Sequence, residues 1–157
     1  MQKHHVWNMQ WKNMVNKVYL DTNIFMDLLD STRPYSKTSW ELVRKMISEA
    51  TLLAINSDTV TNAFYILSKH KIYSASELLA LMKKSVMLFD VVAIEQDEVL
   101  TALSLCEDDN TKFKDYEDAL QYVCAKKIAA DLILTNDKGF VSLDIEVSGI
   151  KSCRVLF

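Results

Sequence analysis

The chain has 157 residues, of which 50% are hydrophobic and 25% are charged, and its formal net charge at pH 7 is −3. This composition is typical of one globular domain, and the acidic balance excludes binding to nucleic acid through overall charge, so that any such binding must be local. Only two glycines occur, Gly139 and Gly149. Their positions exclude both a P-loop and a glycine-rich dinucleotide turn.

The sequence also indicates where the protein works. No apolar run approaches the roughly 18 residues of a membrane span, because Asp90 interrupts the longest candidate, residues 86–94. The first residues contain no hydrophobic segment of the signal-peptide type. The cysteines, Cys106, Cys124 and Cys153, are odd in number and far apart, so neither a disulfide framework nor a zinc site is predicted. We therefore expect a cytoplasmic protein that has no contact with a membrane.

Residues 1–16 carry two tryptophans and the pair His4-His5, without helical or strand periodicity. We expect them to form an N-terminal extension outside the core, with residues 17–157 forming the domain. The two histidines could bind a metal ion, but no cysteine or acidic residue accompanies them. An incidental pair is the better interpretation.

Short apolar runs alternate with amphipathic segments along the rest of the chain. The pattern predicts strands at residues 18–20, 52–55, 91–94, 132–134 and 145–147. It predicts helices near residues 24–29, after a capping box at Thr38–Glu41, and at 57–69, 77–88, 97–106 and 114–125. This order implies an α/β fold of three layers, α/β/α, with a central, mostly parallel sheet.

Three aspartates occupy comparable positions in this plan. Asp21 directly follows the first strand, and Asp137 follows the strand at 132–134 after Thr135 and Asn136. Carboxyl ends of parallel strands share one edge of a sheet, where ligands bind. Asp118 lies in the first turn of the helix before that second strand, and such helices begin at the same edge. We therefore expect the three carboxylates to converge, at about 4–7 Å from one another, where one or two metal ions could bridge them.

A cluster of this kind needs protons or a cation. Two unit charges 4 Å apart repel by about 4 kcal/mol at an effective dielectric constant near 20. Oxygen ligands without histidine or cysteine favour Mg²⁺ or Mn²⁺.

Each acid also has an explanation that involves no chemistry. Asp21 or Thr22 could cap the following helix, and Asp115 and Asp118 have the spacing of an N-cap residue and its N3 partner. Asp137 could serve as a turn former. Capping and turn formation can explain each acid separately. That they alone place all three acids at one edge of the sheet is the less favoured interpretation.

Three motifs in this order resemble those of the PIN domain, a family of metal-dependent nucleases prominent among the toxins of bacterial and archaeal toxin–antitoxin modules. They are Asp21-Thr22-Asn23, Asp118-Ala119 within the segment 114–122, and Thr135-Asn136-Asp137 before Phe140. Each motif alone is weak, whereas their order and strand contexts are fairly specific. The resemblance covers residues 18–140.

The resemblance implies hydrolysis of RNA phosphodiester bonds at a carboxylate-bound Mg²⁺ or Mn²⁺. It implies that Asp21, Asp118 and Asp137 are ligands, while Thr22, Asn23, Thr135 and Asn136 orient water or phosphate. The partners it implies are an RNA substrate, a small antitoxin protein and a second copy of the chain in a homodimer. Lys112, Lys114 and Lys138 flank the acids and could meet the RNA backbone, although lysines so placed are more often simply solvated.

One position departs from the family. Most PIN nucleases carry a glutamate in the helix after the second strand, where this chain has Asn62 in the pattern Thr59-Val60-Thr61-Asn62, which resembles one branch of the family. Asn62 still offers a carbonyl oxygen but removes one negative charge. Asp115, one helical turn from Asp118, could supply that charge as a further metal ligand.

Other protein classes also place aspartates at strand ends. A haloacid-dehalogenase-type phosphatase requires D-x-D, but the residue two after Asp21 is Asn23. A phosphotransfer receiver domain usually shows paired acids near its first strand and a lone lysine after its last strand. This sequence fits that pattern poorly. The remaining alternative is a PIN fold with weakened catalysis that binds RNA or a protein partner.

Overall fold

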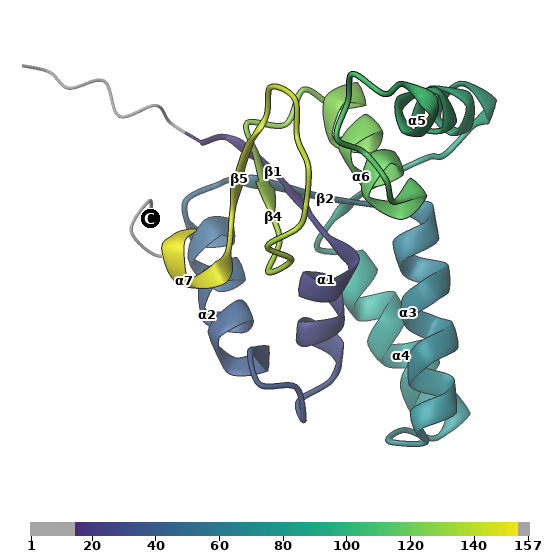
Figure 1. Cartoon of the computed structure of the whole chain (residues 1–157). Coiled ribbons are helices and arrows are strands. Elements are labelled where there is room, and N and C mark those ends of the chain that lie inside the picture. Colours follow the sequence, from purple (N-terminus) through teal and green to yellow (C-terminus); the bar gives the residue numbers. More distant parts are fainter. Residues whose placement is uncertain (1–14, 154–157) are drawn as a thin grey trace, which may run out of the picture.

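A parallel sheet with β1 at its centre organises the fold. The computed structural model describes residues 15–153, and there the sheet has five strands in the order β3-β2-β1-β4-β5 (Figure 1). All four neighbouring pairs are parallel, so the expectation of a mostly parallel sheet is confirmed. The strands are β1 (Lys17–Leu20), β2 (Leu52–Asn56), β3 (Asp90–Val92), β4 (Leu132–Leu134) and β5 (Glu146–Ser148).

Helices connect the first four strands in turn and cover the sheet on both faces, whereas a loop connects β4 to β5. They are α1 (Thr22–Leu29), α2 (Ser36–Ser48), α3 (Ser57–His70), α4 (Ala75–Val86), α5 (Gln96–Glu107), α6 (Tyr116–Lys127) and α7 (Ile150–Cys153). The three-layer α/β/α architecture that the sequence predicts is therefore present.

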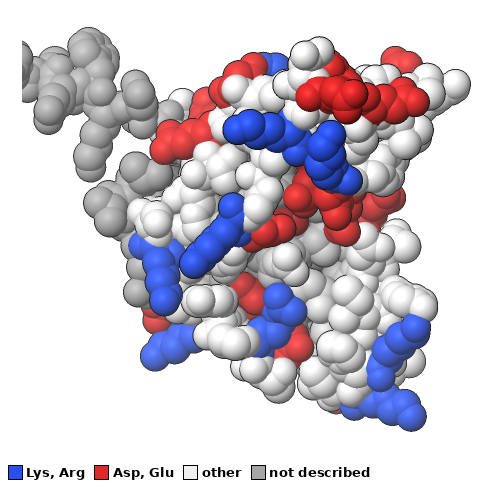
Figure 2. Space-filling model, viewed as in Figure 1, with Lys and Arg blue, Asp and Glu red and all other residues white. Residues whose placement is uncertain are grey.

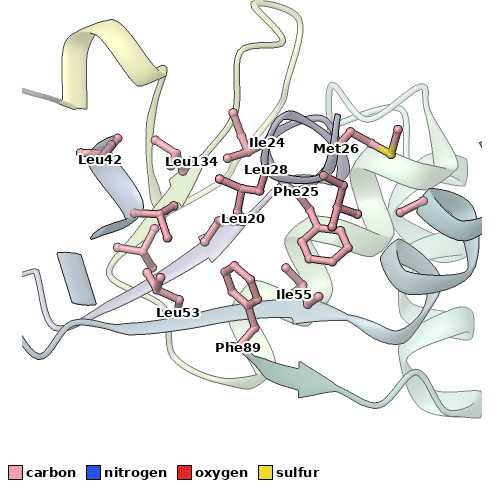
Figure 3. Close-up of a cluster of buried hydrophobic side chains, with 14 of the residues drawn as sticks. Leu20, Ile24, Phe25, Met26, Leu28, Leu42, Leu53, Ile55, Phe89 and Leu134 are labelled. Atoms are coloured by element: carbon pink, nitrogen blue, oxygen red, sulfur yellow. The ribbon is translucent and has the colours of Figure 1, made fainter. Parts of the chain in front are cut away.

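The alternation of side chains along β1 divides the core into two clusters. Val18 and Leu20 lie in a cluster with residues of α1, α2, α3, α4 and α7, part of which Figure 3 shows. Tyr19 points to the opposite face and lies in a cluster formed mainly with α5 and α6. Because side chains alternate with a period of two, a strand segment that is buried on both faces is apolar at every position, as residues 18–20 of β1 are.

The starts of α2, α4 and α6 differ from the sequence prediction, and α6 begins at Tyr116, two residues later than expected. The capping box expected at Thr38–Glu41 is wrong, because α2 already begins at Ser36, and Tyr35 at the N-cap position makes no side-chain cap hydrogen bond. The backbone after Pro34 has already turned, so that the Ser39 amide donates to the Tyr35 carbonyl oxygen at 2.8 Å. A capping box occurs instead at Ser74 and Glu77, and it starts α4 two residues earlier than expected.

Residues 15 and 16, which were expected to belong to the N-terminal extension, contact the domain. Val15 packs against the core, and the Asn16 amide donates a hydrogen bond of 2.9 Å to Oδ2 of Asp131. Residues 1–14, including the pair His4-His5, lie outside the described residues, as do residues 154–157.

The direction in which successive strands are added to the sheet reverses between β1 and β4. From β1 the chain runs outward through β2 to β3, then crosses back to β4 on the other side of β1. Leu20 and Leu134 are partners in the register, so the residues that follow them emerge side by side. In open α/β sheets ligands bind at the carboxyl ends of strands at such a switch point. Among the described helices none is both long and apolar enough to cross a membrane.

Candidate active site at the carboxyl edge of the sheet

A cavity of about 510 Å³ opens at this switch point, and acidic side chains dominate its wall. In Figure 2, acidic side chains gather around the hollowed centre of this face of the molecule. We call the cavity the acidic pocket; its lining residues are Asp21, Thr22, Asn23, Met26, Arg33, Asn62, Tyr65, Ile66, Asp115, Glu117, Asp118 and Asp137.

Asp21 is held by β4 rather than by its own helix. It occupies the N-cap position of α1, but its side chain makes no cap hydrogen bond. Its Oδ2 instead accepts a hydrogen bond of 2.7 Å from the hydroxyl of Thr135, and the residue is only 5% exposed. Helix capping therefore does not explain this carboxylate.

Asp137 is both a turn former and a residue of the pocket wall. Its Oδ1 accepts a hydrogen bond of 2.7 Å from the Gly139 amide, as expected for an aspartate that shapes a turn. Its own amide donates to the Thr135 hydroxyl at 3.0 Å. The Thr135 hydroxyl thus holds two of the acids in place. It donates a hydrogen bond to the Asp21 side chain and accepts one from the Asp137 amide.

The third group of acids comes from the start of α6. Asp115 is the N-cap residue, and its Oδ1 accepts hydrogen bonds from the amides of Glu117 at 2.8 Å and Asp118 at 3.2 Å. The capping role expected for Asp115 is confirmed. The cap fixes the first turn of α6, and the side chains of Asp115, Glu117 and Asp118 all line the pocket.

Burial and repulsion make three carboxyls of the pocket, those of Asp21, Glu117 and Asp118, harder to ionise. Burial is the main cause that raises the pKa of Asp118 to about 6, with added repulsion from Asp115, Asp137, Asp21 and then Glu117. Burial raises the pKa of Asp21 as well; the hydrogen bond from Thr135 opposes that rise, and Asp137 adds to it. Burial followed by the charge of Asp21 raises the pKa of Glu117. The carboxyls of the pocket therefore act as one electrostatic group.

Asp21, Asp118 and Asp137, the acids expected to converge, all line this one pocket. Within residues 15–153, no three His, Cys, Asp or Glu side chains are already close enough together to hold a metal ion. The donors of the pocket wall are nevertheless the oxygens that a hard divalent cation prefers, and their repulsion is what such a cation relieves. The residues present therefore fit Mg²⁺ or Mn²⁺ by chemistry, without a preformed ligand geometry.

Comparison with known proteins identifies the family. Residues 18–146 match the model of the PIN domain. The chain belongs to the PIN domain family. It is 39% identical over 131 residues to Ribonuclease VapC1 of Aquifex aeolicus, an alignment that covers 83% of this chain and 88% of the relative.

Solved structures share the fold of this PIN domain at lower identity. The structure of VapBC2 from Rickettsia felis, bound to a DNA fragment from its promoter, superposes with a TM-score of 0.63 and 16% identity, covering 85% of this chain and 98% of that chain. The Mycobacterium tuberculosis toxin VapC20, described as cleaving the sarcin-ricin loop, gives a TM-score of 0.60 and 13% identity over 80% and 98% of the chains.

The residues expected to orient water or phosphate separate into two groups in this PIN domain. Asn23, Asn62 and Thr22 line the acidic pocket, whereas Thr135 and Asn136 do not. The Asn136 side chain accepts a hydrogen bond of 3.0 Å from the amide of Ile150, at the start of α7. Its observed role is to anchor the last helix.

The Thr22 hydroxyl belongs to a buried network beneath the pocket. It accepts a hydrogen bond of 2.7 Å from Nε2 of Gln121 and lies 3.0 Å from the Thr59 hydroxyl. Oε1 of Gln121 in turn accepts a hydrogen bond of 2.5 Å from the hydroxyl of Tyr19. This network joins β1, α1, α3 and α6 directly below the acids.

Sequence reasoning missed several residues of the pocket wall. Glu117 was overlooked although it adjoins Asp118, and its place in the first turn of α6 was the signal that could have found it. Arg33, in the loop after α1, makes an ion pair of 2.7 Å with the buried Asp27 and also lines the pocket. Tyr65 lies on the exposed side of α3. No periodicity in the sequence indicates that Arg33 or Tyr65 lines the pocket.

The flanking lysines do not surround the acidic pocket. Lys112 and Lys114 are absent from its wall, and Lys114 lies 4.0 Å from Asp109 on the surface. Lys138 lines a separate, adjoining cavity.

Proposed function

We propose that this PIN domain is an endoribonuclease that hydrolyses RNA phosphodiester bonds with Mg²⁺ or Mn²⁺ bound in the acidic pocket. The observation that carries this proposal is the set of five carboxylates lining one cavity at the switch point of the sheet. The relative named as a ribonuclease supports the choice of RNA as substrate.

In this proposal Asp21, Asp118 and Asp137 hold the ion. Bound there, it would lower the pKa of a water molecule, polarise the phosphate and stabilise the leaving oxygen. Asp115 already serves as a helix cap, and it would contribute charge where Asn62 has none.

The other residues of the pocket position these groups. Thr135 restricts the Asp21 side chain through its 2.7 Å hydrogen bond, so the carboxylate needs little rearrangement when it binds a cation. Arg33 is oriented by its ion pair with Asp27, and its guanidinium could meet a phosphate oxygen of the substrate. Arg33 thus adds a positive charge to the wall of the same cavity.

The proposal extends to the cellular role. A toxin of this kind would be held inactive by a small antitoxin protein, as the VapBC2 complex among the similar structures suggests. Its substrate would be cytoplasmic RNA.

The test compares cleavage of single-stranded and structured RNA by the purified protein in EDTA, Mg²⁺ and Mn²⁺. We expect cleavage only with a divalent ion, and millimolar Mg²⁺ should raise the melting temperature, because an ion that binds only the folded state stabilises it. Asp21→Asn and Asp118→Asn should each abolish cleavage and reduce the thermal shift while the protein stays folded. Asp109→Asn, which removes an exposed charge outside the pocket, is the matched control.

Asn62 supports a second candidate, an RNA- or protein-binding module with weakened catalysis. It lines the pocket at the position where most of the family carries a glutamate, so one metal-binding charge is missing. A wild-type protein that shows neither metal-dependent stabilisation nor cleavage of any RNA tested would favour this candidate.

A further inference from the structure

A second cavity, of about 480 Å³, adjoins the acidic pocket. We call it the basic groove; the residues that matter here are Tyr35, Asp137, Lys138, Phe140, Ser148 and Lys151. We propose that the basic groove binds the RNA strand immediately beside the phosphate that is cleaved. This inference rests on the proposed function, and it adds a substrate-binding surface outside the acidic pocket.

The two cavities share Asp137, which lines both. The floor of the groove is the carboxyl end of the sheet, where the Thr135 amide donates a 3.0 Å hydrogen bond to the carbonyl oxygen of Ser148. The α1–α2 loop contributes to both walls, with Arg33 lining the pocket and Tyr35 lining the groove. In the proposal, a strand whose phosphate lies in the pocket passes Asp137 into the groove.

The charge of the groove suits a phosphate backbone. Lys138 and Lys151 are both exposed, and neither forms an ion pair with any residue in the part of the chain that the structure describes. Figure 2 shows basic side chains flanking the acidic centre, including on the side where α7 lies. In a chain with a net charge of −3, such cations provide the local attraction that the overall charge does not.

Two aromatic rings offer surfaces on which bases can stack. Tyr35 is 37% exposed, and the Lys151 ammonium lies 5.7 Å from the centre of its ring. Phe140 is half-buried against the core, which fixes its ring. Aromatic rings interleaved with cations are the usual surface for single-stranded nucleic acid, because every base has a face that stacks.

The test measures RNA binding in EDTA, so that it does not depend on cleavage. The probe is a fluorescein-labelled oligouridine of twelve nucleotides, followed by anisotropy from 50 to 300 mM KCl. The double variant Lys138→Ala/Lys151→Ala should weaken binding at least fivefold at low salt. It should also reduce the slope of log Kd against log salt by about 1.4, since each single-strand phosphate contact contributes about 0.7.

Matched variants separate these effects from a general loss of charge or fold. Lys83→Ala/Lys84→Ala removes the same charge from two exposed residues of α4, which Figure 1 shows on the other side of the molecule from α7. It should change neither the affinity nor the slope. Tyr35→Phe should keep RNA affinity and Tyr35→Ala should reduce it, and circular dichroism should show that each variant is folded.

Three results would overturn the proposal. The first is an equal effect of the two double variants, and the second is a wild type with no measurable RNA binding. The third is a groove variant that keeps RNA affinity but loses binding to a labelled hexaglutamate peptide, which would assign the groove to an acidic protein segment. A groove-dependent RNA binder that never cleaves would refute the proposed function alone. Metal-dependent cleavage with unaffected groove variants would refute the groove alone.

Discussion

The hydroxyl of Thr135 donates a hydrogen bond of 2.7 Å to Oδ2 of Asp21 and thereby joins the ends of β4 and β1. The register explains this contact, because Leu20 and Leu134 are partners and the next residue of each strand emerges beside the other. A threonine two residues before Asp137 therefore determines the position of an aspartate more than a hundred residues away.

Thr135→Val should keep the shape of this side chain and lose both of its hydrogen bonds. Asp21 is buried and would lose a donor that favours its ionised form, so its pKa should rise further. We expect a loss of about 1–3 kcal/mol in the free energy of unfolding, measured with urea. RNA cleavage should fall about 10–100-fold, as when other groups that orient a metal ligand are removed.

Thr135→Ser is the control for that variant, since it keeps the hydroxyl and removes only a methyl group. It should retain most of the stability and the activity. Equal losses in the serine and valine variants would show that packing, and not the hydrogen bond, is what Thr135 contributes.

In metal-free protein, the contribution of Asp118 to stability should fall as the pH rises from about 4 to about 6. The pKa of Asp118 in the folded protein is about 6, mainly through burial and then through repulsion by Asp115, whereas an aspartate in an unfolded chain titrates near pH 3.9. Between these values Asp118 binds more protons in the folded state than in the unfolded state, so its contribution to the free energy of unfolding falls as the pH rises, and above pH 6 this contribution is constant.

Melting temperatures in EDTA between pH 4 and pH 7.5 test this dependence. The wild type should lose stability relative to Asp118→Asn as the pH rises, because the variant lacks the titrating group. Added Mg²⁺ should stabilise the wild type more at pH 7.5 than at pH 5, where protons compete for the same oxygens. Asp30, Glu77, Glu98 and Asp144 have lowered pKa values and act in the opposite direction in both proteins, so the difference between the two curves is the test. A difference that does not change between pH 4 and pH 6 would contradict the assignment of Asp118.

Much of this fold could be predicted from the sequence, because the inner strands β1, β2 and β4 are buried on both faces. Such strands must be short apolar runs, and the polar residues that end them then mark the ligand-binding edge. For that reason Asp21 and Asp137 could be placed at one edge without a structure. The helix α7 could not be predicted, since four residues are too few to show periodicity.

The wall of the site was harder to predict than its acids. Arg33 reaches the pocket from a loop whose course depends on tertiary packing, and local spacing does not record that course. The side-chain oxygen of Asn136, which lines the basic groove, also accepts a hydrogen bond from an amide of α7, an element that the sequence does not reveal. Sequence motifs thus locate strand ends well and side-chain partners poorly.

Asn62→Glu should tighten Mg²⁺ binding by about an order of magnitude, which corresponds to about 1.4 kcal/mol. Asn62 is half-buried in the pocket wall, so the added carboxylate supplies another hard ligand. Without metal the same change should lower the melting temperature through repulsion of Asp118. Titration calorimetry measures the affinity, and an unchanged affinity would show that Asn62 lies too far from the ion.

Asp115→Asn tests whether Asp115 supplies the charge that Asn62 lacks. Asparagine is as good an N-cap residue as aspartate, so α6 should remain capped and the melting temperature in EDTA should change little. A clear loss of Mg²⁺ affinity in this variant would show that Asp115 acts on the ion. An unchanged affinity would restrict Asp115 to its capping role.

The last prediction concerns Gln121, whose amide connects the hydroxyls of Tyr19 and Thr22 beneath the acidic pocket. Gln121→Leu should remove the acceptor of the buried Tyr19 hydroxyl, at a cost of about 1–3 kcal/mol, whereas the Thr22 hydroxyl keeps its contact with Thr59. Tyr19→Phe should cost less, about 1 kcal/mol, because Oε1 of Gln121 keeps a long contact of 3.5 Å with the Asn56 amide. In the double variant the tyrosine hydroxyl is no longer present to be stranded, so the combined loss should be smaller than the sum of the single losses. Urea unfolding of the four proteins measures this coupling, and strictly additive losses would mean that the hydrogen bond between Tyr19 and Gln121 contributes nothing of its own.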